Sequence, residues 1–152
     1  MSFVRIWVHL VFSTKDRYPF FTKEIRPLVI NHIQVNCREK GIFLTEINGH
    51  LEHIHCLISL NKNQTISQVA QLIKGESAFW INKEKIIAGK FAWQDDYFAV
   101  SISESQIESV QNYIRNQEDH HKKKSFSMEI EEFNKKYNWL ISAEQGNKSD
   151  LG

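Results

Sequence analysis

The fold is decided by residues 42–60, which read IFLTEINGHLEHIHCLISL. Two mostly apolar runs, at 42–47 and about 51–60, flank Asn48 and Gly49. An Asn-Gly pair between apolar runs is a strong short-range signal of a β-hairpin, because both residues tolerate the left-handed backbone of a tight turn. This stretch therefore predicts two antiparallel strands that turn at Asn48 and Gly49.

Residues 3–12 predict a further strand, because apolar side chains recur at every second position. The side chains expected on its buried face are Val4, Ile6, Val8, Leu10 and Phe12. Arg5, Trp7 and His9 alternate with them and point to the other face. A short strand is also expected at 97–102.

Helices are expected between these strands. Thr22 would cap a helix that runs to about Lys40, where Gly41 ends it. Asn63 or Thr65 would begin a second helix, because the apolar residues that follow recur with helical spacing.

Two further helices are expected after the last strand. Ser103 and Gln106 have the spacing of a capping box for a helix over about 104–119, and a last helix is expected at about 127–140. The resulting order, β-α-β-β-α-β-α-α, begins with the split βαβ pattern. We predict an α+β fold of ferredoxin-like or RRM-like type. Its antiparallel sheet would carry helices on one face, leave the other face open to nucleic acid or a partner subunit, and add extra C-terminal helices.

The chain is expected to form one domain over residues 1–142, followed by a polar tail at 143–152. No apolar run approaches the ~20 residues of a membrane span. The N-terminus lacks the pattern of a secretory signal, so the expected location is the cytoplasm. Cys37 and Cys56 lie far apart and outside any CxxC pair, which argues against a thiolate zinc site. The net charge of +1 gives little support for a nucleic-acid partner, although a local basic patch would suffice.

His53 and His55 are the first candidate site residues. Side chains at i and i+2 of a strand project from the same face, so both imidazoles point away from the apolar face that includes Ile54. Two neighbouring imidazoles on a rigid strand can chelate one divalent metal. The alternative interpretation is two exposed strand histidines without a ligand.

Tyr113 and Gln117 are the second pair of candidates. Residues at i and i+4 are neighbours on a helix surface, so the two side chains share one flank of the predicted helix. A glutamine carbonyl is an oxygen ligand suited to a hard cation. The alternative interpretation is an aromatic residue at the edge of the core beside a solvated glutamine.

The sequence resembles the single-tyrosine HUH transposases, which are the insertion-sequence-200-like enzymes and their relatives associated with repetitive extragenic palindromes. The resemblance rests on two motifs, His53-Ile54-His55 and Tyr113-Ile114-Arg115-Asn116-Gln117, and extends over about residues 3–140. Two departures stand out. Glu52 occupies a position that is often Asp in the family, and residues 95–98 replace a segment that is commonly rich in glycine.

The resemblance implies a transposase that acts on single-stranded DNA at sites flanked by hairpins. It implies Mg²⁺ or Mn²⁺ held by His53, His55 and Gln117, with Tyr113 as the nucleophile that forms a 5′-phosphotyrosine intermediate. It also implies a homodimer, in which the helix that carries Tyr113 completes the metal site of the partner subunit. Trp7 would line the dimer interface, or else pack under the C-terminal helix.

Phosphate contacts are expected from basic side chains at Lys74, Arg115, Lys122, Lys123 and Lys124. Trp93 or Tyr97 would stack on unpaired bases of a hairpin. Three alternatives remain open at this level. They are a domesticated relative that processes host palindromes, a non-catalytic nucleic-acid-binding module, and a purely structural dimer.

Overall fold

The computed structural model describes residues 1–137, and the predicted end of the domain, Leu140 and the polar tail lie outside the described residues. The elements are β1 (Ile6–Ser13), a 3-10 turn (Lys15–Arg17), α1 (Arg26–Glu39), β2 (Phe43–Gly49), β3 (His53–Leu60), α2 (Ile66–Lys83), β4 (Phe98–Ile102), a 3-10 turn (Glu104–Gln106), α3 (Ile107–Arg115), α4 (Gln117–His121) and α5 (Phe126–Tyr137).

The chain divides into two compact units, residues 1–117 and the residues from Glu118 onwards. The first unit holds a four-stranded sheet in the order β2-β3-β1-β4, with every neighbouring pair antiparallel. This is the strand order of the predicted ferredoxin-like α+β fold, which is confirmed. Among the described residues, no helix has both the length and the apolar character that a membrane crossing requires.

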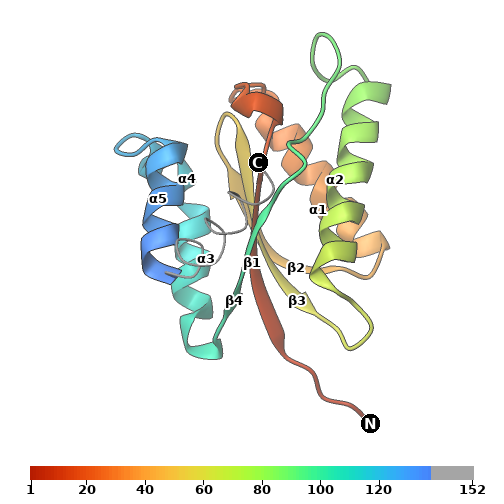
Figure 1. The fold of residues 1–152 in the computed structure, drawn as a ribbon. Helices are drawn as coiled ribbons and strands as arrows, with labels where there is room; N and C mark the ends of the chain where they lie inside the picture. Colours follow the sequence, from red (N-terminus) through yellow and green to blue (C-terminus); the bar gives the residue numbers. More distant parts are fainter. Residues whose placement is uncertain (138–152) are drawn as a thin grey trace, which may run out of the picture. The chain divides into compact units, whose positions relative to one another are not determined.

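The main core lies between the sheet and helices α1 and α2, which Figure 1 shows on the same side of the strands. Alternate residues of β1 and β3 supply it, as strand periodicity requires. The buried strand side chains on this face are Val8, Leu10, Phe12, Ile54, Cys56, Ile58 and Leu60.

The opposite face of the sheet was expected to be open. This expectation is wrong, because α3 packs against β2 and β3 there. This face carries its own buried apolar side chains, namely Val11, Leu57 and Val100, together with Ile114 on α3. The pairing of His9 with Leu57, and of Val11 with His55, aligns these residues with the histidines of β3.

The hairpin between β2 and β3 does not turn at Asn48 and Gly49, so that prediction is wrong. Both residues belong to β2 and pair with His55 and Ile54, and the turn follows at residues 50–52. Gly49 is required for close approach instead, because a Cβ atom there would lie 2.2 Å from the carbonyl oxygen of His53.

The first helix begins later than predicted, whereas its end and the cap of the second helix agree with the prediction. Thr22 accepts a hydrogen bond from the Ile25 N–H at 3.3 Å, but it stabilises a turn that precedes α1, which begins only at Arg26. Gly41 does end this helix, with a φ of 71°. Thr65 caps α2 in a full capping box with Gln68.

The predicted helix over 104–119 is interrupted at Asn116, where ψ reaches 25° and α3 ends. Its predicted cap also differs, because the Ser103 hydroxyl meets the hydroxyl of Ser105 at 3.1 Å and makes no cap bond. Within the C-terminal unit, His121 Nε2 lies 3.6 Å from Glu129 Oε1, and both side chains are buried.

Candidate active site

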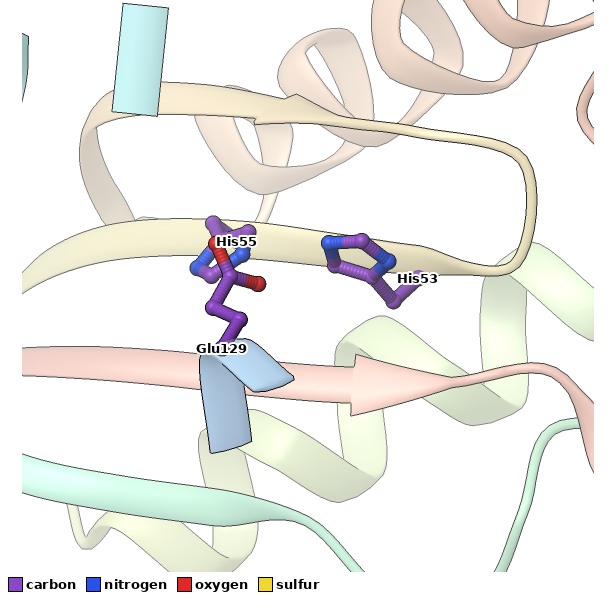
Figure 2. Close-up of side chains that lie close together, drawn as sticks. All are labelled: His53, His55 and Glu129. Carbon is purple, nitrogen blue, oxygen red and sulfur yellow. The ribbon is translucent and has the colours of Figure 1, made fainter. Parts of the chain in front are cut away.

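His53 and His55 project from the same face of β3, as their spacing predicts (Figure 2). Their ring centroids are 5.0 Å apart and the rings are nearly perpendicular, at 77°. Both side chains are 0% exposed, so the interpretation as exposed strand histidines is wrong. Figure 2 also draws Glu129, which belongs to the C-terminal unit.

The two nitrogens of the His53 ring face different oxygen atoms. Nδ1 lies 2.7 Å from Oε1 of Glu52, the residue that precedes it in the chain. Nε2 lies 3.1 Å from Oε1 of Gln117. The structure therefore brings Gln117 to the histidine pair from a position 64 residues further along the chain.

The ring of His55 is held by a second imidazole. Its Nδ1 lies 2.9 Å from Nε2 of His9, which is buried on β1. The two ring centroids are 5.1 Å apart. Each histidine of the pair thus has a partner at its Nδ1 atom, a carboxylate for His53 and an imidazole for His55.

Tyr113 lies beside His55 and His9. Its ring centroid is 5.7 Å from that of His55 and 6.2 Å from that of His9, in both cases edge to face. Tyr113 and both histidines belong to one chain and to one compact unit. The candidate nucleophile and its candidate metal ligands therefore meet without a contribution from a second subunit.

Helix α3 is fastened to the sheet by two residues of β2. Asn48 donates from Nδ2 to the carbonyl oxygen of Arg115 at 3.0 Å. The guanidinium of Arg115 donates to Glu46 at 2.9 Å. Because Asn48 pairs directly with His55 in the sheet, these contacts hold the end of α3 beside the histidines.

The donor atoms at His53 fit a divalent cation. An Nδ1–H that donates to Glu52 leaves the lone pair of a neutral ring on Nε2, where it faces the carbonyl oxygen of Gln117. Two lone-pair atoms so close repel one another unless a cation or a proton lies near them. Adjacent ligands of an octahedral Mg²⁺ ion, each at about 2.1 Å from it, are themselves about 3 Å apart. A proton on Nε2, or a Gln117 amide turned so that its N–H₂ group faces Nε2, would also satisfy the contact.

Lys74 and Arg115, two of the side chains expected to contact DNA, have partners within the first compact unit. Lys74 donates from Nζ to the carbonyl oxygens of Gln94 at 2.7 Å and Asp95 at 2.9 Å. Partial burial lowers the pKa of Lys74, against the opposing effect of Asp95 and Asp96. Arg115 pairs with Glu46 as described above.

The three C-terminal lysines lie in the second unit. Lys122 lies 3.4 Å from Asp119, and Lys124 lies 2.6 Å from Glu132. Lys123 is exposed. The proposed role of these three lysines as phosphate contacts stays a prediction.

Trp93 is a core residue, so its predicted role in base stacking is wrong. Its ring packs edge to face on Phe12 and Phe91, and its Nε1 donates to the Ser77 hydroxyl at 3.0 Å. Tyr97 is 39% exposed and remains a candidate for stacking. Trp7 is half-buried and donates from Nε1 to Glu104 at 3.1 Å.

His9 was not among the residues expected at this site. The alternation of residues 3–12 placed it on the correct face, but the register between β1 and β3 decides which residue it meets. Glu52 stands where the family often has Asp, a change that keeps a carboxylate beside the first histidine. Its carboxylate lies next to His53 because the turn at residues 50–52 ends directly before the histidine.

Comparison with known proteins adds independent findings. Residues 2–117 match the family described as IS200-like transposases. The ISDra2 transposase TnpA of Deinococcus radiodurans is 25% identical over 117 residues, which covers 73% of this chain and 83% of that relative.

Two solved structures share the fold. A Deinococcus radiodurans R1 protein described as a transposase has a TM-score of 0.62 and 21% identity, covering 76% of this chain and 93% of its own. A REP-associated tyrosine transposase bound to a REP hairpin has a TM-score of 0.60 and 14% identity, covering 80% of this chain and 72% of its own.

Proposed function

The chain belongs to the family of IS200-like transposases, and from this premise we propose that it cuts single-stranded DNA and transfers the strand through a covalent bond to Tyr113. One observation carries the proposal. The Tyr113 ring lies 5.7 Å from the ring of His55, within one chain. A phenol, two imidazoles and a glutamine carbonyl are thereby gathered at one buried place on the sheet.

The residues proposed to hold the metal are His53, His55 and Gln117. A mixed set of nitrogen and oxygen donors suits Mn²⁺ and is tolerated by Mg²⁺. When bound, such a cation neutralises charge on the phosphate oxygens and aligns the phosphate for attack. Glu52 accepts the Nδ1 proton of His53 and so keeps the lone pair of that ring on Nε2.

Tyr113 is the proposed nucleophile. Its hydroxyl oxygen attacks the phosphorus of a phosphodiester and releases its proton to solvent, and the bond from phosphorus to the 3′ oxygen breaks as that oxygen takes up a proton from solvent. The products are a 5′-phosphotyrosine and a free 3′-OH. Because the covalent bond conserves the energy of the phosphodiester, another 3′-OH can attack it and join new ends without ATP.

The proposed substrate is a single strand that carries a hairpin near the cut. The REP-associated relative in the solved complex is bound to a hairpin, and this supports the same class of ligand for this chain. Lys122, Lys123 and Lys124, which lie in the C-terminal unit, are proposed as phosphate contacts. Lys74 and Arg115 would have to contact DNA in addition to their partners within the chain.

A homodimer in the cytoplasm remains a prediction. The position of Tyr113 beside the histidines of its own chain supports a site that is complete within one subunit. A mobile element and a domesticated relative would share this chemistry. Hairpins at both ends of the gene would identify a mobile element, and palindromes scattered elsewhere would identify the domesticated type.

The experiment incubates the protein and Mn²⁺ with labelled single strands copied from the flanks of its gene. Denaturing gel electrophoresis should show labelled DNA migrating with the protein. Tyr113→Phe should lose this adduct and retain binding to the same strand in a gel-shift assay. An adduct of undiminished yield with the Phe variant would show that the nucleophile is another residue.

A further inference from the structure

We propose that His9 is a positioning residue of the metal site, which accepts the Nδ1 proton of His55 and thereby directs the Nε2 lone pair of that ring to the metal. The inference rests on the metal site proposed above. It adds a residue of β1 to a site that the two family motifs place on β3 and the tyrosine helix.

The contact between the two imidazoles allows only two arrangements when both rings are neutral. At 2.9 Å, one nitrogen must donate and the other must accept. If His9 donates, the remaining proton of His55 lies on Nε2, and that nitrogen cannot bind a metal. If His55 donates from Nδ1, its Nε2 atom carries the lone pair. Only the second arrangement is compatible with His55 as a ligand through Nε2.

The environment of His53 supports the same arrangement. Its Nδ1 faces the Glu52 carboxylate at 2.7 Å, which accepts and cannot donate. His9 faces the Nδ1 atom of His55 in the same way that Glu52 faces the Nδ1 atom of His53. A histidine ligand usually donates its second N–H to such an acceptor, and loss of the acceptor typically costs 10–100-fold in metal affinity. Here one acceptor is charged and the other is a neutral imidazole, which adds no negative charge next to the phosphate.

The alternative is that His9 only fills space. It is buried on β1, and its ring packs edge to face on Tyr113 at 6.2 Å. A leucine of similar size would retain most of this packing and remove the acceptor. A purely structural role therefore predicts that His9→Leu affects stability and leaves metal affinity unchanged.

The test measures Mn²⁺ binding to the full chain without DNA, by the loss of the free-ion electron paramagnetic resonance signal. His9→Leu should weaken binding by about 10–100-fold, in line with the loss of such an acceptor. In His9→Gln, the amide oxygen extends about as far as the imidazole Nε2, so this variant should bind within about threefold of the parent protein. Urea unfolding of the metal-free variants checks that each is folded. If His9→Leu does not fold, His9→Asn replaces it, because its amide is too short to reach His55.

His53→Ala separates the two proposals. If the parent protein and His53→Ala bind Mn²⁺ equally, the proposed metal site is wrong. If His53→Ala loses binding while His9→Leu binds like the parent protein, the site stands and the role of His9 is wrong. Equal weakening in His9→Leu and His9→Gln would also overturn the inference, since the acceptor would then not be what matters.

Discussion

The Nε2 atom of His53 lies 3.1 Å from the Oε1 atom of Gln117, across 64 residues of sequence. The first residue belongs to the central strand β3, and the second follows the tyrosine helix α3. Gln117 is buried, so this contact is made away from bulk water. A metal held by both side chains would couple the strand to the helix that carries Tyr113. Metal binding and nucleophile placement would then depend on one another.

Substitution of Gln117 should change metal affinity in a way that depends on the oxygen donor. Gln117→Ala removes the donor, and we expect Mn²⁺ affinity to fall about tenfold or more, whereas Gln117→Glu keeps an oxygen ligand and should bind at least as tightly as the parent protein. Isothermal titration calorimetry measures both. Gln111→Ala, on the preceding helix α3, is the control and should bind normally. Normal affinity in Gln117→Ala would remove this residue from the ligand set.

Gly49→Ala should destabilise the protein, because the added Cβ atom would lie 2.2 Å from the His53 carbonyl oxygen. Forced overpacking of this kind costs about 1–3 kcal/mol. Gly75→Ala is the matched control, because nothing lies within 4 Å of a Cβ atom there. It lies inside α2 and should stabilise the protein by up to about 1 kcal/mol. Urea unfolding compares them, and equal stability of the two variants would contradict the packing described at Gly49.

Asn48→Ala should slow formation of the covalent adduct, although the variant remains folded. The variant loses the bond from Nδ2 to the Arg115 carbonyl that fastens the end of α3. The free energy of unfolding should fall by about 1 kcal/mol. Asn61→Ala, which loses a 2.8 Å turn bond to the Asn63 N–H away from the site, is the control. Identical adduct rates in the two variants would show that the fastening does not position Tyr113.

Cys37 should make the protein less stable in alkali. Burial, with a smaller effect of Glu76, raises the pKa of its thiol from 9.0 to about 11. The unfolded chain releases this proton at a lower pH than the folded one. The contribution of Cys37 is therefore fully present below pH 9.0 and is lost as the pH rises towards about 11. Cys37→Ala should show a shallower decline of unfolding free energy over this interval, and an unchanged slope would contradict the shift.

The local part of the site could be predicted from sequence. The common direction of His53 and His55 follows from the period of a strand. The period of a helix placed Tyr113 and Gln117 on one flank, but α3 ends at Arg115 and Gln117 begins α4, so the two residues do not share one continuous helix. Both regularities act within a few residues. The fold class was predicted from the order of the strands and helices along the chain.

The remaining parts depend on contacts between distant segments. His9 meets His55 because of the register between β1 and β3, which no pattern within residues 3–12 determines. Trp93 lies in a segment without periodicity and is buried by aromatic residues from elsewhere in the chain. At Gly49 a local turn signal was misleading, because the missing side chain serves the approach of the His53 carbonyl.

The central claim is that Tyr113 becomes covalently bound to DNA. Proteolysis of the adduct, nuclease treatment and tandem mass spectrometry of the peptides test it most directly. The account predicts a nucleotide 5′-phosphate on the phenolic oxygen of Tyr113, only when Mn²⁺ or Mg²⁺ is present. A nucleotide on another residue such as Tyr97, or cleavage that leaves every tyrosine unmodified, would contradict it.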